Sequence, residues 1–208
     1  MPTVVIDHPL AAQRLATLRE ETTGAAAFRR ALKELGGFLV YESTRLLPQA
    51  DLVVQTPLST AAAKVLGPMP VLVPVLRAGL GLLDAALTLL PEADVGMIGL
   101  QRDEETLLPA SYLAKLPSSL AGRPALVLDP MLATGGSLVH TLGVLRAAGC
   151  TAISVCCVLA APEGLAHLIH SGFGDVDVYT AAIDDHLDDR GFIVPGLGDA
   201  GDRQFGTL

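Results

Sequence analysis

Residues 129–137, with the sequence DPMLATGGS, lie between an apolar run typical of a buried strand and the apolar spacing of a helix. In a strand-to-helix turn, Thr134, Gly135, Gly136 and Ser137 would expose backbone N–H groups and two hydroxyls where a phosphate can bind. A plain turn would use the same residue types. The segment lacks the lysine of a Walker loop and the GxGxxG pattern of a dinucleotide fingerprint. It therefore indicates a phosphate that belongs to neither a nucleoside triphosphate nor a dinucleotide.

Arg77 could place a positive charge beside such a phosphate. It ends the apolar run VLVPVL and precedes the small residues Ala78 and Gly79. Its guanidinium could therefore reach a pyrophosphate through charge-assisted hydrogen bonds, although a solvated surface arginine is the alternative. The GLG at residues 79–81 begins like a Rossmann turn, but Asp84 occupies the third glycine position, so a dinucleotide turn gains little support.

A second arginine, Arg102, lies in the segment GLQRDEETLLPASYLAKLP, residues 99–117. Its acidic run, two prolines and Tyr112 predict a hairpin or a mobile arm, and loops of this kind commonly close over active sites. The acidic run Asp103 to Glu105 is more typical of a solvated turn than of a metal site.

The C-terminal segment 183–208 is rich in glycine yet too apolar around Phe192 and Leu197 for a disordered tail. We expect an ordered loop without a regular element, whose backbone N–H and C=O groups suit the amide-like edge of a pyrimidine. An acidic surface loop explains its polar residues better than a metal site does; these residues are Asp184, Asp185, His186, Asp188 and Asp189. His167 and His170, three residues apart on an expected helix, are expected to be surface histidines.

The elements that must position these segments follow from the hydrophobic pattern. Helices are expected in DHPLAAQRLATLRE, residues 7–20, and from about Gly24, where Phe28, Leu32, Leu35 and Leu39 share a face. After Pro48, short apolar runs alternate with helical stretches, and the run DLVVQTPL is taken as the first strand. Apolar strands separated by helices indicate a doubly wound, mainly parallel α/β sheet. Ligands of such a sheet bind outside the carboxyl ends of its strands.

Length and composition restrict the kinds of protein that this chain can be. The 208 residues are 50% hydrophobic and predict one domain, with a core at about 50–182, helices at 8–47 and a tail at 183–208. The formal charge of −8 argues against nucleic-acid binding. The apolar runs are too short to span a membrane, and the first ten residues do not resemble a signal peptide, so we expect a cytoplasmic protein. Surplus apolar surface predicts a homo-oligomer, and the three cysteines are expected to be reduced.

Taken together, the segments resemble the uracil phosphoribosyltransferases, which belong to the type I phosphoribosyltransferases. The resemblance covers almost the whole chain and rests on motifs in the family's order and spacing: DHPL, YESTR, VPVLRAG, GLQRDEETLLPASYLAKLP, LDPMLATGGS and GFIVPGLGDAGDRQFGT. It implies the type I phosphoribosyltransferase fold, with an N-terminal helical extension and a C-terminal hood over the base. It also implies the salvage reaction of uracil with 5-phospho-α-D-ribose 1-diphosphate, which yields uridine 5'-monophosphate and diphosphate and uses Mg²⁺. A GTP effector and a homodimer or larger assembly are possible implications.

Carried over residue by residue, the resemblance assigns three groups of site residues. The donor-binding set is Arg77, Arg102, Asp129, Pro130, Met131, Leu132, Ala133, Thr134, Gly135, Gly136, Ser137 and Asp199. The catalytic set is Arg77, Arg102 and Asp199, and the uracil-binding set is Ile193, Gly198, Asp199 and Ala200. Arg102 to Lys115 would be the arm that covers the site. No residue is assigned as a direct metal ligand, because Mg²⁺ is expected through the diphosphate and waters.

Two positions depart from the pattern associated with the family. Phe192 stands where a tyrosine is common, and Asp129 is followed by Pro130, whereas many type I relatives have two adjacent carboxylates. The role of Asp199 stays open between acid–base assistance and contact with the metal or ribose. A pyrimidine-responsive RNA-binding regulator of the same fold is the alternative function, and the negative charge counts against it. A nucleoside kinase would need a Walker lysine, which the sequence lacks.

Overall fold

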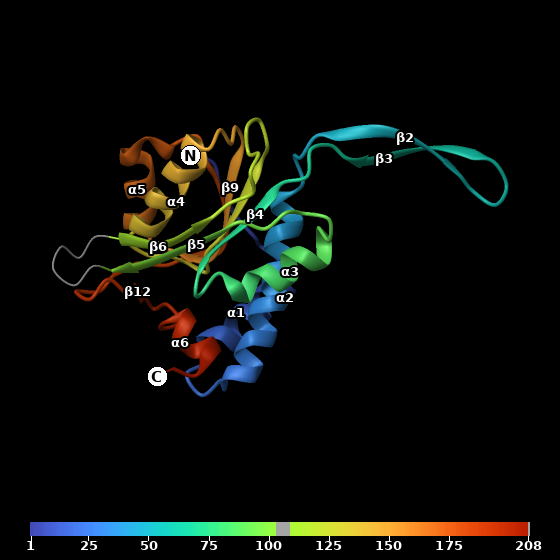
Figure 1. The fold of residues 1–208 in the computed structure, drawn as a ribbon. Helices are drawn as coiled ribbons and strands as arrows, with labels where there is room; N and C mark the ends of the chain where they lie inside the picture. Colours follow the sequence, from blue (N-terminus) through green and yellow to red (C-terminus); the bar gives the residue numbers. More distant parts are fainter. Residues whose placement is uncertain (103–108, 208) are drawn as a thin grey trace.

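A mainly parallel sheet forms the centre of the protein (Figure 1). Its strands are β1 (Thr3–Val5), β4 (Val71–Leu76), β5 (Met97–Arg102), β6 (Pro109–Lys115), β7 (Ala125–Leu128), β8 (Met131–Leu132), β9 (Ile153–Ala160) and β10 (Asp177–Ile183). This computed structural model describes residues 1–102 and 109–207, and side chains outside 101–111. The strand order is β1-β10-β9-β7-β4-β5-β6, with β8 beside β9. The pairs are parallel from β1 to β5, and β6 runs antiparallel to β5. The expected α/β sheet is therefore confirmed.

Helices cover both faces of the sheet. They are α1 (Pro9–Arg19), α2 (Ala25–Ser43) and α3 (Leu80–Leu89) on one face, and α4 (Gly136–Ala147), α5 (Pro162–Leu168) and the π-helical turn η1 (Ile169–Phe173) on the other. The predicted stripe of α2 is buried, and its Gly36 lets α3 approach, because a Cβ there would lie 2.9 Å from the Leu82 side chain. Cys156 and Cys157 belong to the two opposite cores and are free thiols. The expected N-terminal helical segment thus forms a layer of the core.

The first expected strand pairs differently from the prediction. β2 (Gln49–Gln55) forms an antiparallel hairpin with β3 (Thr60–Leu66) and takes no place in the central sheet. Figure 1 shows this hairpin extending away from the rest of the protein. The prediction of a strand here is confirmed, but the apolar run of 52–54 also suits a two-stranded ribbon, which the prediction did not consider.

The segment at 97–115 forms the expected hairpin, because β5 and β6 pair from Met97–Lys115 to Arg102–Pro109. Its connecting residues 103–108, including the acidic run, lie outside the described part of the chain. Within the described residues, no helix has the length and apolar character required to cross a bilayer.

Candidate active site

A pocket of about 350 Å³ joins three segments that are distant in the sequence. It is lined by Ala78 after β4, by Asp129, Met131 and Ala133 after β7, and by residues 190–193 and 198–201 of the C-terminal segment. Because β4 and β7 are parallel neighbours, the residues that follow them emerge at the same edge of the sheet. The tail lies across this edge and closes one side of the pocket.

The loop after β7 presents unpaired backbone donors at the start of α4. Gly135 is the N-cap with φ of +81°, and a Cβ there would lie 3.0 Å from the Gly164 carbonyl oxygen, so both conformation and space favour glycine. Within the described residues, the N–H groups of Gly135, Gly136 and Ser137 donate no hydrogen bond to the chain. Together with the positive end of the twelve-residue α4, these groups can bind a phosphate.

Asp129 is the carboxylate nearest the core in this pocket. It follows the buried strand β7, is 8% exposed, and its N–H donates to the Cys156 carbonyl. Burial raises the pKa of Asp129 to about 7, against the lowering effect of the Met131 backbone N–H. The carboxyl can therefore change charge near neutral pH, and a bound cation or a hydroxyl group would favour its ionised form.

Arg77 lies at the edge of the site and is held by the C-terminal helix α6 (Ala200–Phe205). Its Nη2 donates to Asp202 Oδ1 at 3.0 Å, and its guanidinium lies 5.9 Å from the centre of the Phe205 ring. Gln204, which is buried, donates from Nε2 to the Ala78 carbonyl at 2.9 Å. Arg77 therefore points to α6 and is not among the residues that line the pocket. The Arg102 side chain lies outside the described residues.

The C-terminal segment contains short regular elements, which corrects the expectation of none. β11 (His186–Leu187) pairs with β12 (Ile193–Val194), and α6 follows. The hairpin turn is stabilised by Asp188, whose Oδ1 accepts the N–H groups of Arg190 at 2.9 Å and Phe192 at 2.8 Å. Gly191, Gly196 and Gly198 lie in the turns between these elements, and Gly206 ends α6; each has positive φ, so these glycines permit the turns instead of preventing structure.

Long-range contacts attach this segment to the N-terminal helices. Arg19 donates to both carboxylate oxygens of Asp184, at 2.8 and 2.5 Å, and to the Gly196 carbonyl at 2.8 Å. Burial alone would raise the pKa of Asp184, but Arg19 and the Gly196 N–H keep it below its usual value. Arg203 donates to the carbonyls of Leu18, Glu20 and Leu197. These contacts hold the tail over the pocket.

The four residues expected to hold uracil line one pocket. Ile193 lies in β12, and Gly198, Asp199 and Ala200 come directly before or at the start of α6. Asp199 is also the N-cap of α6, because its Oδ1 accepts the Asp202 N–H at 2.9 Å. The pocket thus combines a buried apolar side chain with exposed backbone groups.

Comparison with known proteins decides the family. A family model described as uracil phosphoribosyltransferase matches residues 5–207. The chain belongs to the uracil phosphoribosyltransferase family. A uracil phosphoribosyltransferase of Dictyoglomus thermophilum is 50% identical over 205 residues, which cover 98% of this chain and 99% of that protein. The RNA-binding alternative finds no support in these matches.

Solved structures agree with the family assignment. A protein of Aquifex aeolicus shares 39% identity with a TM-score of 0.92, over 98% of this chain and 97% of that chain. An adenine phosphoribosyl transferase of Trypanosoma brucei, solved with AMP, pyrophosphate and ribose-5-phosphate, is 15% identical with a TM-score of 0.58, over 91% and 86% of the two chains. The second likeness shows the shared phosphoribosyltransferase fold.

The arrangement of the carboxylates bears on how a metal ion could bind in this protein. The part of the chain that the structure describes contains no group of three or more His, Cys, Asp or Glu side chains arranged to hold a metal ion. Asp184 is bound to Arg19, and Asp188 holds a turn. Asp129 and Asp199 line the pocket. This arrangement does not fit an ion enclosed by protein ligands, and it fits a Mg²⁺ that keeps most of its ligands from diphosphate and water.

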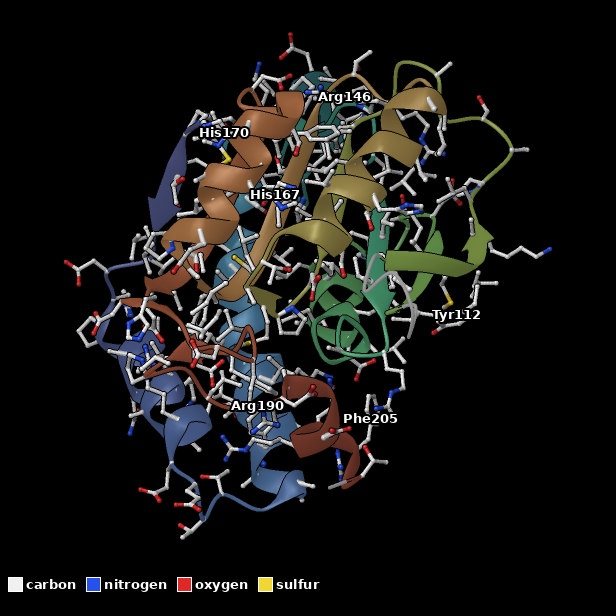
Figure 2. All side chains as sticks on the ribbon, turned by 90° about the vertical axis from the view of Figure 1, so that its left-hand side faces the viewer. Tyr112, Arg146, His167, His170, Arg190 and Phe205 are labelled. Atoms are coloured by element: carbon white, nitrogen blue, oxygen red, sulfur yellow. The ribbon has the colours of Figure 1, made fainter. Side chains whose placement is uncertain are left out.

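Five residues that line the pocket were not predicted as site residues: Ala78, Arg190, Gly191, Phe192 and Gly201. Arg190, Gly191 and Phe192 line the pocket beside the uracil-binding set, and the Arg190 guanidinium lies 5.1 Å from the centre of the Phe192 ring. Figure 2 labels Arg190 and Phe205 at the end of the protein opposite Arg146. The available signal was the arginine of DDRGFIV, which stands two residues before the apolar run 192–194 and directly after two aspartates.

Proposed function

We propose that this protein transfers a 5-phosphoribosyl group from 5-phospho-α-D-ribose 1-diphosphate to uracil, producing uridine 5'-monophosphate and diphosphate. The observation that carries the proposal is the single pocket that joins the glycine loop after β7 to the backbone-rich tail. One side offers donors for a sugar phosphate and the other offers donors and acceptors for a base. Family membership supports both halves of the assignment.

The donor would lie along the loop after β7. The free N–H groups of 135–137 suit the 5'-phosphate, and Asp129 lies where it could accept from a ribose hydroxyl. The remaining loop residues, Pro130 to Thr134, would shape this surface. Arg77 would exchange Asp202 for the diphosphate, and Arg102 would add a second positive charge. Neutralising the leaving diphosphate lowers the barrier, because negative charge accumulates there as the C1–O bond breaks.

Uracil would bind to the tail through the backbone near Ile193 and Gly198–Ala200. Holding its N1 in line behind C1 places the nucleophile opposite the leaving group. The sugar ring gains positive charge in the transition state, as in glycosyl transfer generally. We assign Asp199 to positioning, because the hydrogen bond that its Oδ1 accepts from the backbone of α6 holds the carboxylate in place beside the pocket.

Mg²⁺ would bind mainly to the donor's diphosphate and supply further charge neutralisation there. Water must be excluded, since it would hydrolyse the donor. That the segment from Arg102 to Lys115 covers the site during turnover stays a prediction.

The defining experiment incubates the purified protein with uracil, donor and Mg²⁺ and measures uridine monophosphate by chromatography. We expect product that depends on all three components and is absent with cytosine. Absence of uridine monophosphate would refute the proposed function. GTP, expected as an effector only from the resemblance, can be added to the same assay; a cytoplasmic location is likewise an expectation.

We also propose a homo-oligomer. In the β2–β3 hairpin, every residue of β2 is exposed and β3 contains both exposed and half-buried residues; Val53 and Leu58 are 71% and 96% exposed. An isolated two-stranded hairpin is marginally stable in water, so contact with a second copy would stabilise it. Light scattering should give a mass above that of one chain, and a monomer at micromolar concentration would contradict this.

A further inference from the structure

His167, a residue outside the assigned site, touches the phosphate-binding loop. Its Nδ1 lies 2.7 Å from the Thr134 carbonyl oxygen. A carbonyl oxygen only accepts, so Nδ1 must carry the hydrogen and donate it. Both the neutral Nδ1–H ring and the protonated ring meet this requirement. In Figure 2, His167 lies between α5 and α4, whereas His170 lies farther out.

The geometry of the peptide explains why this contact matters. The Thr134–Gly135 peptide is trans, so its C=O and N–H point in opposite directions. A carbonyl held toward α5 therefore directs the Gly135 N–H away from α5. This N–H is one of the donors that the chain leaves free.

The glycine that follows this peptide leaves its orientation weakly fixed by the loop itself. Rotating it changes φ of Gly135, and glycine tolerates φ of either sign. An outside contact is therefore needed to keep one orientation. The backbone of α5 is already fixed against the loop, because a Cβ on Gly164 would lie 2.3 Å from the Ala133 carbonyl oxygen. His167 projects from this fixed support.

We propose that His167 is a positioning residue that locks the Thr134–Gly135 peptide with its N–H toward the donor's 5'-phosphate. The inference rests on the proposed function, because it concerns the same phosphate. It assigns no contact between His167 and any substrate.

The test compares two variants of similar size, His167→Asn and His167→Leu. The Asn amide nitrogen can take the place of Nδ1, whereas Leu has no donor. We expect H167L to raise the KM for the donor about five- to tenfold, the range that one hydrogen bond supports, and H167N to stay within about twofold of the parent. The kcat and the KM for uracil should change little, since the phosphate contact is made equally in the ground and transition states. Leu has the higher helix propensity, so lower stability of H167L cannot explain this order.

Binding measurements separate the 5'-phosphate from the rest of the donor. Calorimetry should show weaker binding of ribose 5-phosphate to H167L, with the binding of Mg²⁺–diphosphate unchanged. His170→Leu is the matched control and should alter neither. Equal effects of H167L on both ligands, no effect on either, or failure of Asn to restore binding would overturn the proposal. These assays need no turnover, so a protein that binds as expected but forms no uridine monophosphate would refute only the proposed function.

Discussion

The two sides of the pocket are held in place by different means. The phosphate-binding loop at 129–137 lies between β7 and α4, which directly precede and follow it in the sequence. The tail at 184–205 depends on contacts with the N-terminal helices: the Arg19 side chain, 165 residues away, donates to Asp184, and Arg203 of the tail donates to the Leu18 carbonyl, 185 residues away. A local strand–turn–helix pattern thus sets one binding surface, and charged contacts between distant residues set the other. Perturbing the tail should therefore affect base binding first, and perturbing the loop should affect donor binding.

The largest effect is expected for Arg19→Ala. It leaves the buried Asp184 without its partner, a loss of about 3 kcal/mol in the local stability of the tail. The KM for uracil should rise strongly and amide hydrogens of 184–198 should exchange faster, while diphosphate binding is retained. Arg45→Ala removes an exposed pair with Glu42 and serves as control. Equal kinetics for the two variants would show that the tail does not depend on Arg19.

Arg77→Ala tests the point where the tail meets the donor side. Removing one preorganised charged contact should cost on the order of 3 kcal/mol in the transition state, about a hundredfold in kcat/KM. The fold should survive, because the Arg77 side chain is 55% exposed. Lys33→Ala, which removes another exposed ion pair, is the control. Near-normal turnover would remove Arg77 from the catalytic set.

Asp129→Asn should make the protein more stable above neutral pH and less active. Burial raises the pKa of Asp129 from 3.8 to about 7, so the unfolded carboxyl ionises first and the folded protein loses stability as pH rises between these values. Asn removes this loss. At pH 8 we expect the free energy of unfolding to rise by about 2 kcal/mol, which corresponds to a few degrees in Tm. The gain is not larger because burying the polar amide of Asn also costs free energy. The gain should vanish near pH 4, and a gain that is independent of pH would contradict the assignment.

Gly135→Ala should have the smallest effect. Its φ of +81° and the nearby Gly164 carbonyl predict a cost of about 1–2 kcal/mol at the loop. The KM for the donor should rise and the KM for uracil should not. Gly172→Ala provides the matched control, since Gly172 has φ of +85° with open space around it. A similar rise in both variants would point to general destabilisation.

The sequence predicted the phosphate-binding loop and its neighbouring strand and helix well. The strand expected before Asp129 and the helix expected after the glycines follow from patterns within a short window, and the structure confirms them as β7 and α4. The tail was expected to be ordered, but its regular elements did not follow from the sequence in the same way. Its hairpin and α6 depend on Asp188 and Asp199 as capping groups, and its position depends on Arg19 and Arg203.

The β2–β3 hairpin is a second feature that the sequence did not predict. The apolar run of β2 is typical of a strand in either setting. Only the pairing partner distinguishes a strand of a two-stranded ribbon from a strand of the central sheet. The contact between His167 and Thr134 was equally hidden, because a lone histidine on a short helix gives no sign of the loop that it will meet. The assigned roles of the site residues stay predictions until the kinetic tests are made.

The attachment of the tail to α1 has a consequence for protein synthesis. During translation the N-terminal helices, the sheet and the glycine loop leave the ribosome before the residues that complete the base pocket. Domains fold largely as units while they emerge, but Arg19 cannot meet Asp184 and Gly196 until those residues have been made. A nascent chain can therefore form the donor side while it still lacks the base side. Catalytic competence should arise only after residues 184–205 have left the ribosome.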